Sequence, residues 1–518
     1  MTDKHYYLTT PIYYVNDVPH IGHAYTTLAC DVLARFKRLD GYQVHFLTGT
    51  DEHGQKVENS AANAGIDPQT FTDKVSENFR DLAQKMGFSN DDFIRTTEPR
   101  HIEASQAIWR KLQKNGHIYL GKYAGWYAVR DEAFYGEDEL TKNEDGVRIA
   151  PSGAEVEWLE EPSYFFDLSK WQDRLLEFYD ANPDFIAPNS RRNEVISFVK
   201  SGLHDLSVSR TSFNWGVPVP DDPDHIMYVW LDALTNYATA VGYPDENSDA
   251  FTKWWPADLH VVGKDILRFH AVYWPAFLMG ANIATPNRIF AHGWWTNEGQ
   301  KISKSVGNII DPIDIVDKYG LDQVRYFLLR EVPFGNDGDF SHDAVAGRMN
   351  SDLANDLGNL AQRVLSMVNK NCDAKVPNTG EVTPDSGIAV HKALLGAQEL
   401  RDKVRGHMDR QAFHDALEEI WRVVRDANRC VDEDAPWALR KSDPRKMASV
   451  LYVLAETIRH LAIILQPFMP DSCRKMLDQL SVAEEARNFD DLATALTPGT
   501  HLPKPEGVFP RLVEEVVK

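Results

Sequence analysis

The sequence predicts an α/β protein in which a parallel-sheet domain is split by a mixed α/β insertion and followed by an α-helical bundle. Three observations carry this prediction. The first residues follow a strand–helix–strand order, the character of the chain changes from about Asn115 to Asp224, and helical periodicity is nearly continuous beyond about Ser341. At 518 residues the chain is long enough for several domains.

The first segment has the pattern of a βαβ unit. Tyr6–Thr10 is rich in β-forming residues and is followed by Pro11, which predicts a strand that ends there. Gly41 predicts the end of the following helix, and Val44–Thr48 is the next strand. The apolar residues of that helix follow helical spacing: Tyr25, Leu28, Ala29, Val32 and Phe36. A parallel arrangement is the natural packing for this order.

The middle of the chain interrupts that pattern. Aromatic residues, prolines and glycines interleave with short β-like runs, which include Tyr123–Tyr135 and Trp158–Asp167. Strand and helix patterns resume at Tyr228–Trp230 and Leu259–Gly263. The middle region therefore reads as a mixed α/β insertion that divides a nucleotide-binding sheet into two halves.

The last part of the chain carries apolar stripes at spacings of three and four residues. Such stripes bury themselves against one another, which predicts a helical bundle. The stripes are Val345, Met349, Leu353, Leu357, Leu360 and Val364; Phe413, Leu417, Trp421 and Val424; and Val450, Leu454, Ile458, Leu461 and Leu465.

Features of the whole sequence indicate the cellular compartment of the protein. The N-terminus lacks the basic-then-apolar layout of a signal peptide, and no apolar run approaches the roughly 18 residues that span a bilayer. The four cysteines stand singly, so neither a disulfide framework nor a clustered zinc site is expected: Cys30, Cys372, Cys430 and Cys473. We expect a cytoplasmic protein with reduced thiols and no contact with a membrane.

The net charge of −22 argues against a protein that coats nucleic acid nonspecifically. It leaves local RNA recognition open, because long-range attraction is screened within about 10 Å at ordinary salt.

The run His20-Ile21-Gly22-His23 follows the first strand and opens its helix. Backbone N–H groups at a helix start are unpaired and attract phosphate. Two imidazoles three residues apart lie on one face of a helical turn and can both donate to phosphate oxygens, while Gly22 lets a flat adenine or ribose approach the backbone. Taken alone, the run is a weak signal, since either histidine could be a capping or packing residue.

The run Lys301-Ile302-Ser303-Lys304-Ser305 lies nearly three hundred residues later, between Glu298-Gly299 and Gly307-Asn308, and reads as a mobile loop. Two ammonium groups at this spacing can neutralise the charge that builds on a pyrophosphate leaving group. Alone, the run is also compatible with a solvated basic loop. The two runs together, in this order and at this separation, point to one active site.

With these two runs the sequence resembles the class I aminoacyl-tRNA synthetases, whose signatures are H-I-G-H and K-M-S-K-S. Ile302 replaces the usual Met, an apolar exchange that leaves the resemblance intact. The methionyl-tRNA synthetase family is the most similar, and the likeness covers essentially the whole chain. Its motifs here are Thr9–Asn16, Gly49–Gly54, Tyr228–Ala233, Gly263–Ile266, Asn359–Arg363 and Asp434–Trp437.

The resemblance implies a ligase that activates L-methionine with ATP to methionyl-adenylate. The methionyl group then passes to the 3'-terminal adenosine of tRNA(Met), for initiation and elongation of translation. It implies a Rossmann-type catalytic domain in two halves, residues 1–114 and 226–284, around a connective insertion at 115–225. A stem-contact region with the Lys301–Ser305 loop follows at 285–342, then a helical anticodon-binding domain with the C-terminal tail at 343–518.

The resemblance also assigns roles to single residues. For ATP, it implies that His20 and His23 hold the triphosphate, that Lys301 and Lys304 close over the pyrophosphate, and that Mg²⁺ arrives with the nucleotide rather than in a protein cage. The remaining ATP-site matches are Gly22, Gly263, Asp265, His292 and Gly293.

For the amino acid, Asp51 matches the carboxylate that pairs with the ammonium group, and Arg210 matches a basic residue near the reacting carboxylate. The side-chain pocket matches Ile12, Tyr14, Trp230, Ala233, Leu234, Tyr237, Phe269 and His270. A pocket of aromatic edges suits a thioether sulfur, at about 0.3–1.5 kcal/mol per contact. For each apolar residue taken alone, ordinary core packing is the alternative.

In the helical part, Asn359 and Arg363 are one turn apart, about 100° from the apolar stripe, and so share a polar face. Trp437 follows Pro436 just past a helix end, where an indole can stack on an unpaired anticodon base. A packing contact is the alternative for Trp437.

The sequence also departs from part of the family. Many members hold zinc through cysteine knuckles in the insertion, but here Ala128 and Asp131 stand where cysteines would be, and no cysteine lies between Cys30 and Cys372. We therefore expect no structural zinc. The chain has no dimerising module after the bundle, so a monomer is expected.

Three alternatives remain. A small adenylyltransferase would share the H-x-G-H turn but is far shorter. A sister synthetase for another apolar amino acid is closer, although an insertion of about 110 residues is small for an editing domain. A non-enzymatic tRNA-binding paralogue is disfavoured by the retention of His20, His23, Asp51, Arg210 and Lys304.

Overall fold

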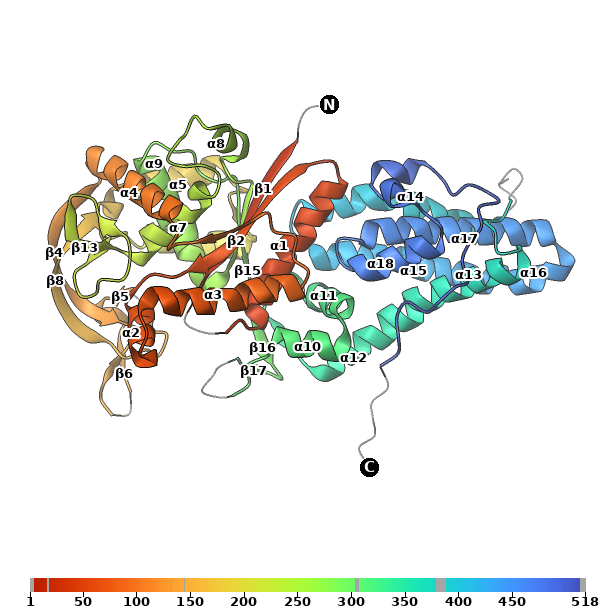
Figure 1. Ribbon diagram of the computed structural model, residues 1–518, viewed down its shortest axis with the longest axis horizontal. Helices are drawn as coiled ribbons and strands as arrows, with labels where there is room; N and C mark the ends of the chain where they lie inside the picture. Colours follow the sequence, from red (N-terminus) through yellow and green to blue (C-terminus); the bar gives the residue numbers. More distant parts are fainter. Residues whose placement is uncertain are drawn as a thin grey trace. The chain divides into compact units, whose positions relative to one another are not determined.

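The computed structural model of the chain describes residues 4–15, 18–131, 133–143, 145–302, 307–378 and 388–512, which fold into two compact units (Figure 1). The sheet unit comprises His5–Cys30 and Val44–His292, and the helical unit comprises Met1–Lys4, Asp31–Gln43 and Gly293–Lys518. Helix α1 (Ile21–Leu39) begins in the sheet unit and ends in the helical unit.

A six-stranded sheet in the order β3-β2-β1-β14-β15-β9 forms the centre of the sheet unit. The β2–β3, β1–β14, β14–β15 and β15–β9 pairs are parallel, which confirms the predicted fold class. The strand order reverses direction between β1 and β14, the position at which open parallel sheets bind ligands. The strands are β1 (His5–Tyr14), β2 (Gln43–Asp51), β3 (Asp92–Arg95), β9 (Ile186–Ala187), β14 (Leu259–Gly263) and β15 (Ile289–His292).

Strand β1 does not end at Pro11 as the sequence predicts, but continues to Tyr14. The fixed φ of proline is compatible with extended backbone, and proline removes only one donor from the ladder. The difference matters because the residues after Pro11 include two of the predicted pocket residues, Ile12 and Tyr14.

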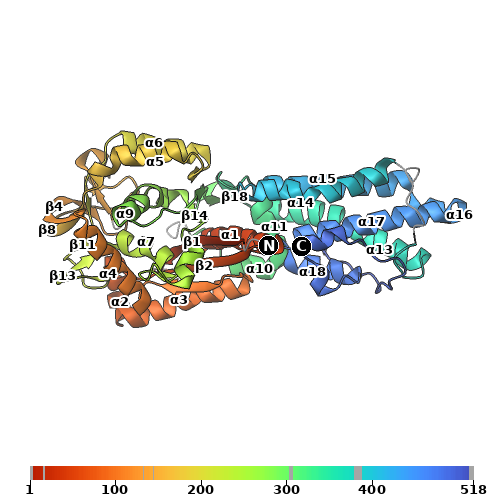
Figure 2. The same cartoon turned by 90° about the horizontal axis from the view of Figure 1, so that it is seen from above.

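Helices cover the sheet on both sides, and Figure 2 shows α2 and α3 on one side of the sheet unit and α5 and α6 on the other. The Tyr228–Trp230 run proves to be the start of helix α7. The covering elements are α2 (Gln55–Ala64), α3 (Pro68–Lys85), α4 (Pro99–Lys114), α5 (Gln172–Ala181), α6 (Asn189–Lys200), α7 (Val229–Thr239), α8 (Asp249–Trp254) and α9 (Trp274–Gly280), with the short turns η2 (Leu168–Trp171), η3 (Lys264–Ile266) and the π-helix η4 (Phe269–Tyr273).

The long antiparallel hairpin of β4 (Ile118–Ala128) and β8 (Glu157–Phe166) dominates the insertion (Figure 1). Its other strands are β5 (Ala133–Tyr135), β6 (Thr141–Lys142), β7 (Arg148–Ile149), β10 (Leu206–Ser207), β11 (Ser209–Arg210), β12 (Pro218–Val219) and β13 (Asp222–Met227), with the turn η1 (Glu137–Glu139). Strand β9 falls within the same stretch of sequence but pairs with β15, so this stretch also supplies an edge strand to the parallel sheet.

The helical unit is a bundle, as the apolar stripes predict, with a small sheet before it. The strands are β16 (Trp295–Asn297), β17 (Gln300–Lys301) and β18 (Gly338–Phe340). The helices are α10 (Pro312–Tyr319), α11 (Leu321–Arg330), α12 (His342–Arg348), the π-helix η5 (Met349–Gly358), α13 (Asn359–Asn371), α14 (Ile388–Met408), α15 (Phe413–Asp434), α16 (Pro436–Ser442), α17 (Pro444–Leu465), α18 (Pro470–Gln479), η7 (Glu484–Ala486) and η8 (Asp490–Ala493).

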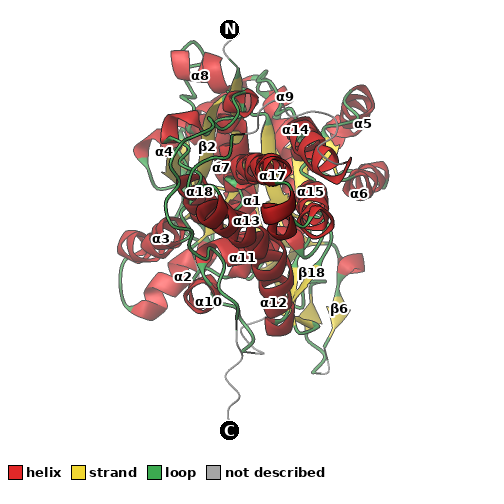
Figure 3. Cartoon of the chain, turned by 90° about the vertical axis from the view of Figure 1, so that its right-hand side faces the viewer, coloured by secondary structure: helices red, strands yellow, loops and turns green. Residues whose placement is uncertain are grey.

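Helix α17 is the central helix of the bundle, packed against α13, α14, α15, α16 and α18 (Figure 3). By length and composition it could cross a membrane, but 83% of its apolar window is buried inside the protein. Its apolar surface is therefore explained by the core of the bundle.

Candidate active site

Four of the residues predicted for the nucleotide and the amino acid lie at the carboxyl edge of the parallel sheet. Tyr14 ends β1, Asp51 ends β2, Gly263 ends β14 and His292 ends β15. Gly263 and His292 are direct partners in the ladder. Strands that are far apart in sequence thus place these side chains at one edge, where parallel sheets bind their ligands.

The two histidines of H-I-G-H lie against each other at the start of α1, with ring centroids 3.9 Å apart. The backbone N–H of His20 donates to Nδ1 of His23, and the N–H of Gly22 donates to Nδ1 of His20, both at 3.1 Å. A Cβ at position 22 would lie 2.9 Å from Cε1 of His20. A side chain at position 22 would therefore displace the His20 ring from this position.

These hydrogen bonds decide which ring nitrogens can donate. Burial lowers the pKa of His20, although Asp265 opposes the shift, and burial together with His20 lowers the pKa of His23 well below its usual value. Both rings are thus neutral at pH 7, and each Nδ1 is an acceptor. The single proton of each ring must lie on Nε2, so both histidines can donate from Nε2 to an anion.

Aromatic residues hold His23 in place. The Tyr13 ring meets it edge-on at 4.8 Å, and the Phe79 ring of α3 meets it at 5.3 Å. Tyr13 and Phe79 stack on each other at 5.6 Å. The sequence prediction missed both residues, because an aromatic residue in a strand or helix cannot be told from ordinary core.

His292 is tied to the start of α1 by Thr26, a residue that the sequence prediction also missed. Thr26 Oγ1 donates to the carbonyl of Gly22 at 3.0 Å and lies 2.7 Å from Nε2 of His292. Since the hydroxyl proton points to Gly22, Thr26 accepts from His292. The contact joins the end of β15 to the H-I-G-H turn.

Asp265 lies in the turn that follows β14. A Cβ at position 263 would lie 2.5 Å from Oδ1 of Asp265, so Gly263 leaves space for this carboxylate over the strand end. Asp265 also favours the charged form of His20, which places both side chains within electrostatic reach.

Four of the predicted pocket residues form an aromatic cluster, defined as Trp230, Tyr237, Phe269 and His270. Trp230 and Phe269 stack with centroids 3.7 Å apart and planes 6° from parallel. His270 lies 6.3 Å from Trp230 and 5.7 Å from Tyr237 by ring centroids. The cluster is built from α7 and the π-helix η4, which bring these four residues together.

The hydrogen bonds inside the aromatic cluster also show which atoms carry the protons. Nδ1 of His270 lies 3.0 Å from the carbonyl of Ile266 and must donate to it. Burial lowers the pKa of His270 to about 4, so its Nε2 is an acceptor. The Tyr237 hydroxyl, 2.7 Å away, therefore donates to His270. His260 stacks on Tyr237 at 4.1 Å and bonds Thr9 at 2.8 Å, which fixes the Tyr237 ring from its other face.

Ile12, Tyr14 and Leu234 belong to one extended hydrophobic core, and Ala233 is buried. Ile12, Tyr14 and Trp230 are partly buried and pack against the core that contains Leu234 and Tyr237. Nζ of Lys56 lies 5.3 Å from the centroid of the Tyr14 ring. Asp51 is 7% exposed at the end of β2.

Arg210 is almost fully buried, at 2% exposure. Its Nη1 donates to Ser207 Oγ and to the Ser209 carbonyl, both at 2.7 Å, and its guanidinium lies over the Tyr228 ring at 4.7 Å. Tyr228 immediately precedes α7, so the arginine packs at the base of the helix that carries Trp230.

The second signature lies in the helical unit. Lys301 ends strand β17, which pairs with β16 through a hairpin at Glu298 and Gly299, rather than lying in a loop as predicted. Its Nζ lies 5.5 Å from the Trp294 ring. Lys304 lies outside the described residues. A Cβ at Gly293 would lie 2.2 Å from the Asn336 carbonyl, so backbone packing already explains that glycine.

The residues predicted to contact the anticodon lie near one another on the bundle. Asn359 is exposed at the start of α13, and Arg363 follows one turn later. The Arg363 guanidinium lies 5.7 Å from the Trp437 ring and donates to Asp432 at 2.8 Å. Trp437 lies in the first turn of α16, just past the end of α15, and is 51% exposed.

The knuckle region of the insertion does not provide a metal donor set. Ala128 is buried in a small core with Ala150, Ala154 and Val156. Asp131 accepts from Tyr135 Oη at 2.9 Å and from Ser152. Among the residues that the structure describes, no group of three or more His, Cys, Asp and Glu is placed to hold a metal.

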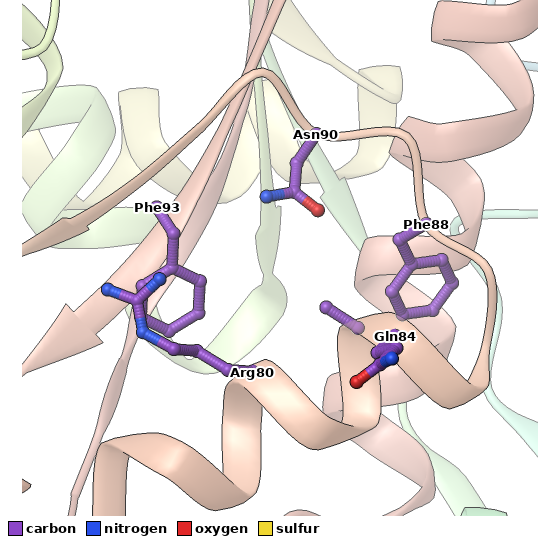
Figure 4. Close-up of a pocket in the computed structure, with 6 residues that line it drawn as sticks. Arg80, Gln84, Phe88, Asn90 and Phe93 are labelled. Carbon is purple, nitrogen blue, oxygen red and sulfur yellow. The ribbon is translucent and has the colours of Figure 1, made fainter.

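A shallow cavity of about 230 Å³ lies beside α3 and the loop before β3 (Figure 4). Its walls are Arg80, Ala83, Gln84, Phe88, Asn90 and Phe93, and none of the predicted site residues line it.

The chain has an imidazole pair at a helix start, at the switch point of a parallel sheet. It also has an inserted domain and a helical bundle. Together these features define a class I aminoacyl-tRNA synthetase. The comparisons with known proteins identify the family. The family described as “tRNA synthetases class I (M)” matches residues 6–365, and “Anticodon binding domain of methionyl tRNA ligase” matches residues 376–518.

Relatives match over the whole chain. The methionine--tRNA ligase of Rickettsia felis is 60% identical over 99% of both chains, and that of Mesorhizobium japonicum is 56% identical over 99% of both. The Mycobacterium tuberculosis methionyl-tRNA synthetase in complex with methionyl-adenylate is 55% identical, with a TM-score of 0.95 over 98% of this chain and 100% of that one. The chain belongs to the methionyl-tRNA synthetase family, and its activity is the ATP-dependent ligation of methionine to tRNA.

Proposed function

We propose that the carboxyl edge of the sheet is where methionine and ATP react to give methionyl-adenylate. The observation that carries this proposal is the pairing of two neutral histidines that donate from Nε2 with a partly buried aromatic cluster. The first suits phosphate oxygens and the second suits a thioether.

In the activation step, His20 and His23 donate to the phosphates of ATP, while Gly22, Gly263, Asp265, His292 and Gly293 surround the adenosine. Lys301 and Lys304 neutralise the pyrophosphate as the α-phosphate bond to it breaks and the methionine carboxylate bonds to phosphorus. Preorganised donors of this kind stabilise charge that develops in the transition state. Mg²⁺ would arrive with the nucleotide and would neutralise part of the phosphate charge.

For methionine, Asp51 pairs with the ammonium group and Arg210 lies toward the carboxylate. The thioether enters the aromatic cluster, flanked by Ile12, Tyr14, Ala233 and Leu234. The Tyr237 hydroxyl is already bonded to His270, so it does not compete for the side chain of the amino acid.

For tRNA(Met), Asn359, Arg363 and Trp437 contact the anticodon, and the 3'-terminal adenosine receives the methionyl group. The proximity of Arg363 to the exposed Trp437 supports a shared surface. We propose that residues 1–114 and 226–284 form the catalytic domain and that 115–225 form the insertion. We propose that residues 285–342 form the stem-contact region and that 343–518 form the anticodon-binding domain with the C-terminal tail. We further propose a cytoplasmic monomer, in keeping with the burial of α17 inside the protein.

An ATP–pyrophosphate exchange assay across all twenty amino acids tests the proposal. We expect exchange that depends on methionine. Exchange that prefers another amino acid contradicts the assigned pocket, and absence of exchange contradicts the assigned active site.

A further inference from the structure

A fully buried carboxylate, Asp232, lies in helix α7 between two pocket residues, Trp230 and Ala233. Its Oδ2 lies 2.6 Å from Nδ1 of His53, and its Oδ1 lies 2.7 Å from Nε2 of His101. The side chain has no exposed surface. A buried charge is costly unless it is paired and hydrogen-bonded, so this arrangement is a specific one.

The protonation states of the trio follow from its hydrogen bonds. Burial raises the pKa of Asp232, but the attraction of His53 and the hydrogen bonds from both histidines outweigh it and lower the pKa to about 2. Thr239 donates to the Thr235 carbonyl, so it accepts from Nδ1 of His101. His101 therefore donates to Asp232 from Nε2 and to Thr239 from Nδ1.

The trio joins three elements by hydrogen bonds to one carboxylate. His53 is two residues beyond Asp51, just past the end of β2, and His101 lies in the first turn of α4. Asp232 is on α7, two residues after Trp230. One carboxylate thus connects the turn that carries the ammonium-binding residue to the helix that carries the side-chain pocket.

A second anchor holds the same turn from the other side. Glu52, between Asp51 and His53, is fully buried and accepts a bidentate pair from Arg95 at 2.7 and 2.9 Å, together with Thr50 and Thr97. This anchor ties the turn to β3 at the sheet edge. The link through Asp232 runs toward the helix that carries Trp230 and Tyr237.

We propose that Asp232 is a positioning residue for methionine, which through His53 sets the Asp51 carboxylate at a fixed distance from the α7 face of the pocket. The inference rests on the proposed roles of Asp51 and Trp230. A ligand with an ammonium group at one end and a thioether at the other gains from both contacts only if their separation is held.

The test is steady-state ATP–pyrophosphate exchange with Asp232→Asn. We expect the KM for methionine to rise roughly tenfold while the KM for ATP changes less than about twofold, because only binding of the amino acid depends on this distance. The matched control is Asp167→Asn, which alters another buried carboxylate that accepts from a histidine and a tryptophan, His117 and Trp171, in the insertion. It should leave both KM values unchanged.

Variants of His53 test whether the effect runs through the pair. His53→Asn keeps an N–H near the position of Nδ1 and should retain most methionine affinity, whereas His53→Leu should match Asp232→Asn. The double variant His53→Leu/Asp232→Asn should be no worse than either single one. If Asp232→Asn does not fold, the two His53 variants carry the test, since they keep the Asp232–His101 pair.

Equal increases in both KM values, the same increase in Asp167→Asn, or additive effects in the double variant would each overturn the inference. Failure of the proposed function has a different outcome, because the unaltered enzyme would then show no methionine-dependent exchange.

Discussion

The backbone N–H of His20 donates to Nδ1 of His23 at 3.1 Å, across two rings whose centroids are 3.9 Å apart. This hydrogen bond occupies the Nδ1 lone pair of His23, so the N–H donor of the His23 ring is Nε2. His20 is held in the same way by the N–H of Gly22. The backbone of the H-I-G-H run thus determines the tautomers of both of its histidine rings.

This arrangement predicts that glutamine replaces each histidine better than asparagine does. The amide of Gln reaches the position of Nε2, whereas that of Asn reaches the position of Nδ1. We expect His23→Asn to lower kcat for exchange by roughly 10- to 100-fold, since a hydrogen bond to a charged group contributes about 1.5–3 kcal/mol, and His23→Gln to lower it less.

The same comparison at His20 provides the control for this prediction. Gln should again be the milder change there. Equal losses for Asn and Gln at both positions would show that Nε2 is not the donor that matters.

The buried histidines also predict how stability depends on pH. Burial lowers the pKa of His270 to about 4, below the value of about 6.5 in an unfolded chain. The unfolded state therefore binds more protons, and the stabilisation present above pH 6.5 is lost as the pH falls toward 4. For His270 alone the full loss is about 3 kcal/mol, and His20, His23 and His260 act in the same direction.

Denaturant unfolding between pH 7.5 and 5 measures this effect, and the midpoint should fall steadily over that range. His270→Gln keeps an acceptor for Tyr237 but does not titrate, so its midpoint should fall less. A variant as sensitive to pH as the unaltered protein would rule out His270 as a source of the effect.

The knuckle of the insertion gives a third prediction. Asp131 bonds Tyr135 and Ser152, and Ala128 lies in an alanine-rich core, so side-chain contacts hold this region together. Elemental analysis should find far less than one zinc per chain, and a chelator should leave the melting temperature unchanged. Stoichiometric zinc would contradict this.

Asp131→Ala, in contrast, should lower the melting temperature, because it leaves two hydroxyl donors unpaired at a cost of about 1–3 kcal/mol. Asp145→Ala, in an exposed turn of the same insertion, is the control and should melt like the unaltered protein.

Local patterns predicted the parts of the fold that depend on neighbours in sequence. The helical spacing from Tyr25 to Phe36 and the turn at Gly41 gave α1, and the three apolar stripes gave the bundle. Strand β9 could not be predicted in this way. It is two residues long, and only its pairing with β15, about a hundred residues away, makes it a strand.

In the active site, too, features set by neighbours in sequence could be predicted, and contacts between distant residues could not. H-I-G-H could be placed at a helix start, because the strand before it and the helix after it are both local patterns. The Asp232 trio was not predicted, although both Asp232 and His53 lie in motifs that carried the resemblance. His101 and His53 are 131 and 179 residues away from Asp232 in sequence, and only the folded chain brings them together. A carboxylate inside the apolar start of α7 was the available signal, since such a group must find a partner.

Trp437 carries the last prediction. Its ring is half exposed, lies 5.7 Å from the Arg363 guanidinium and sits in the first turn of α16. Stacking of one base on an aromatic ring contributes about 1–3 kcal/mol, so Trp437→Ala should raise the KM for tRNA by roughly 5- to 150-fold. Because the residue belongs to the helical unit and not to the sheet edge, methionine-dependent exchange should be unchanged. Leu395→Ala, which removes another exposed apolar side chain of the same unit, should alter neither reaction. An equal loss of exchange and of tRNA charging in Trp437→Ala would instead make the tryptophan a structural residue.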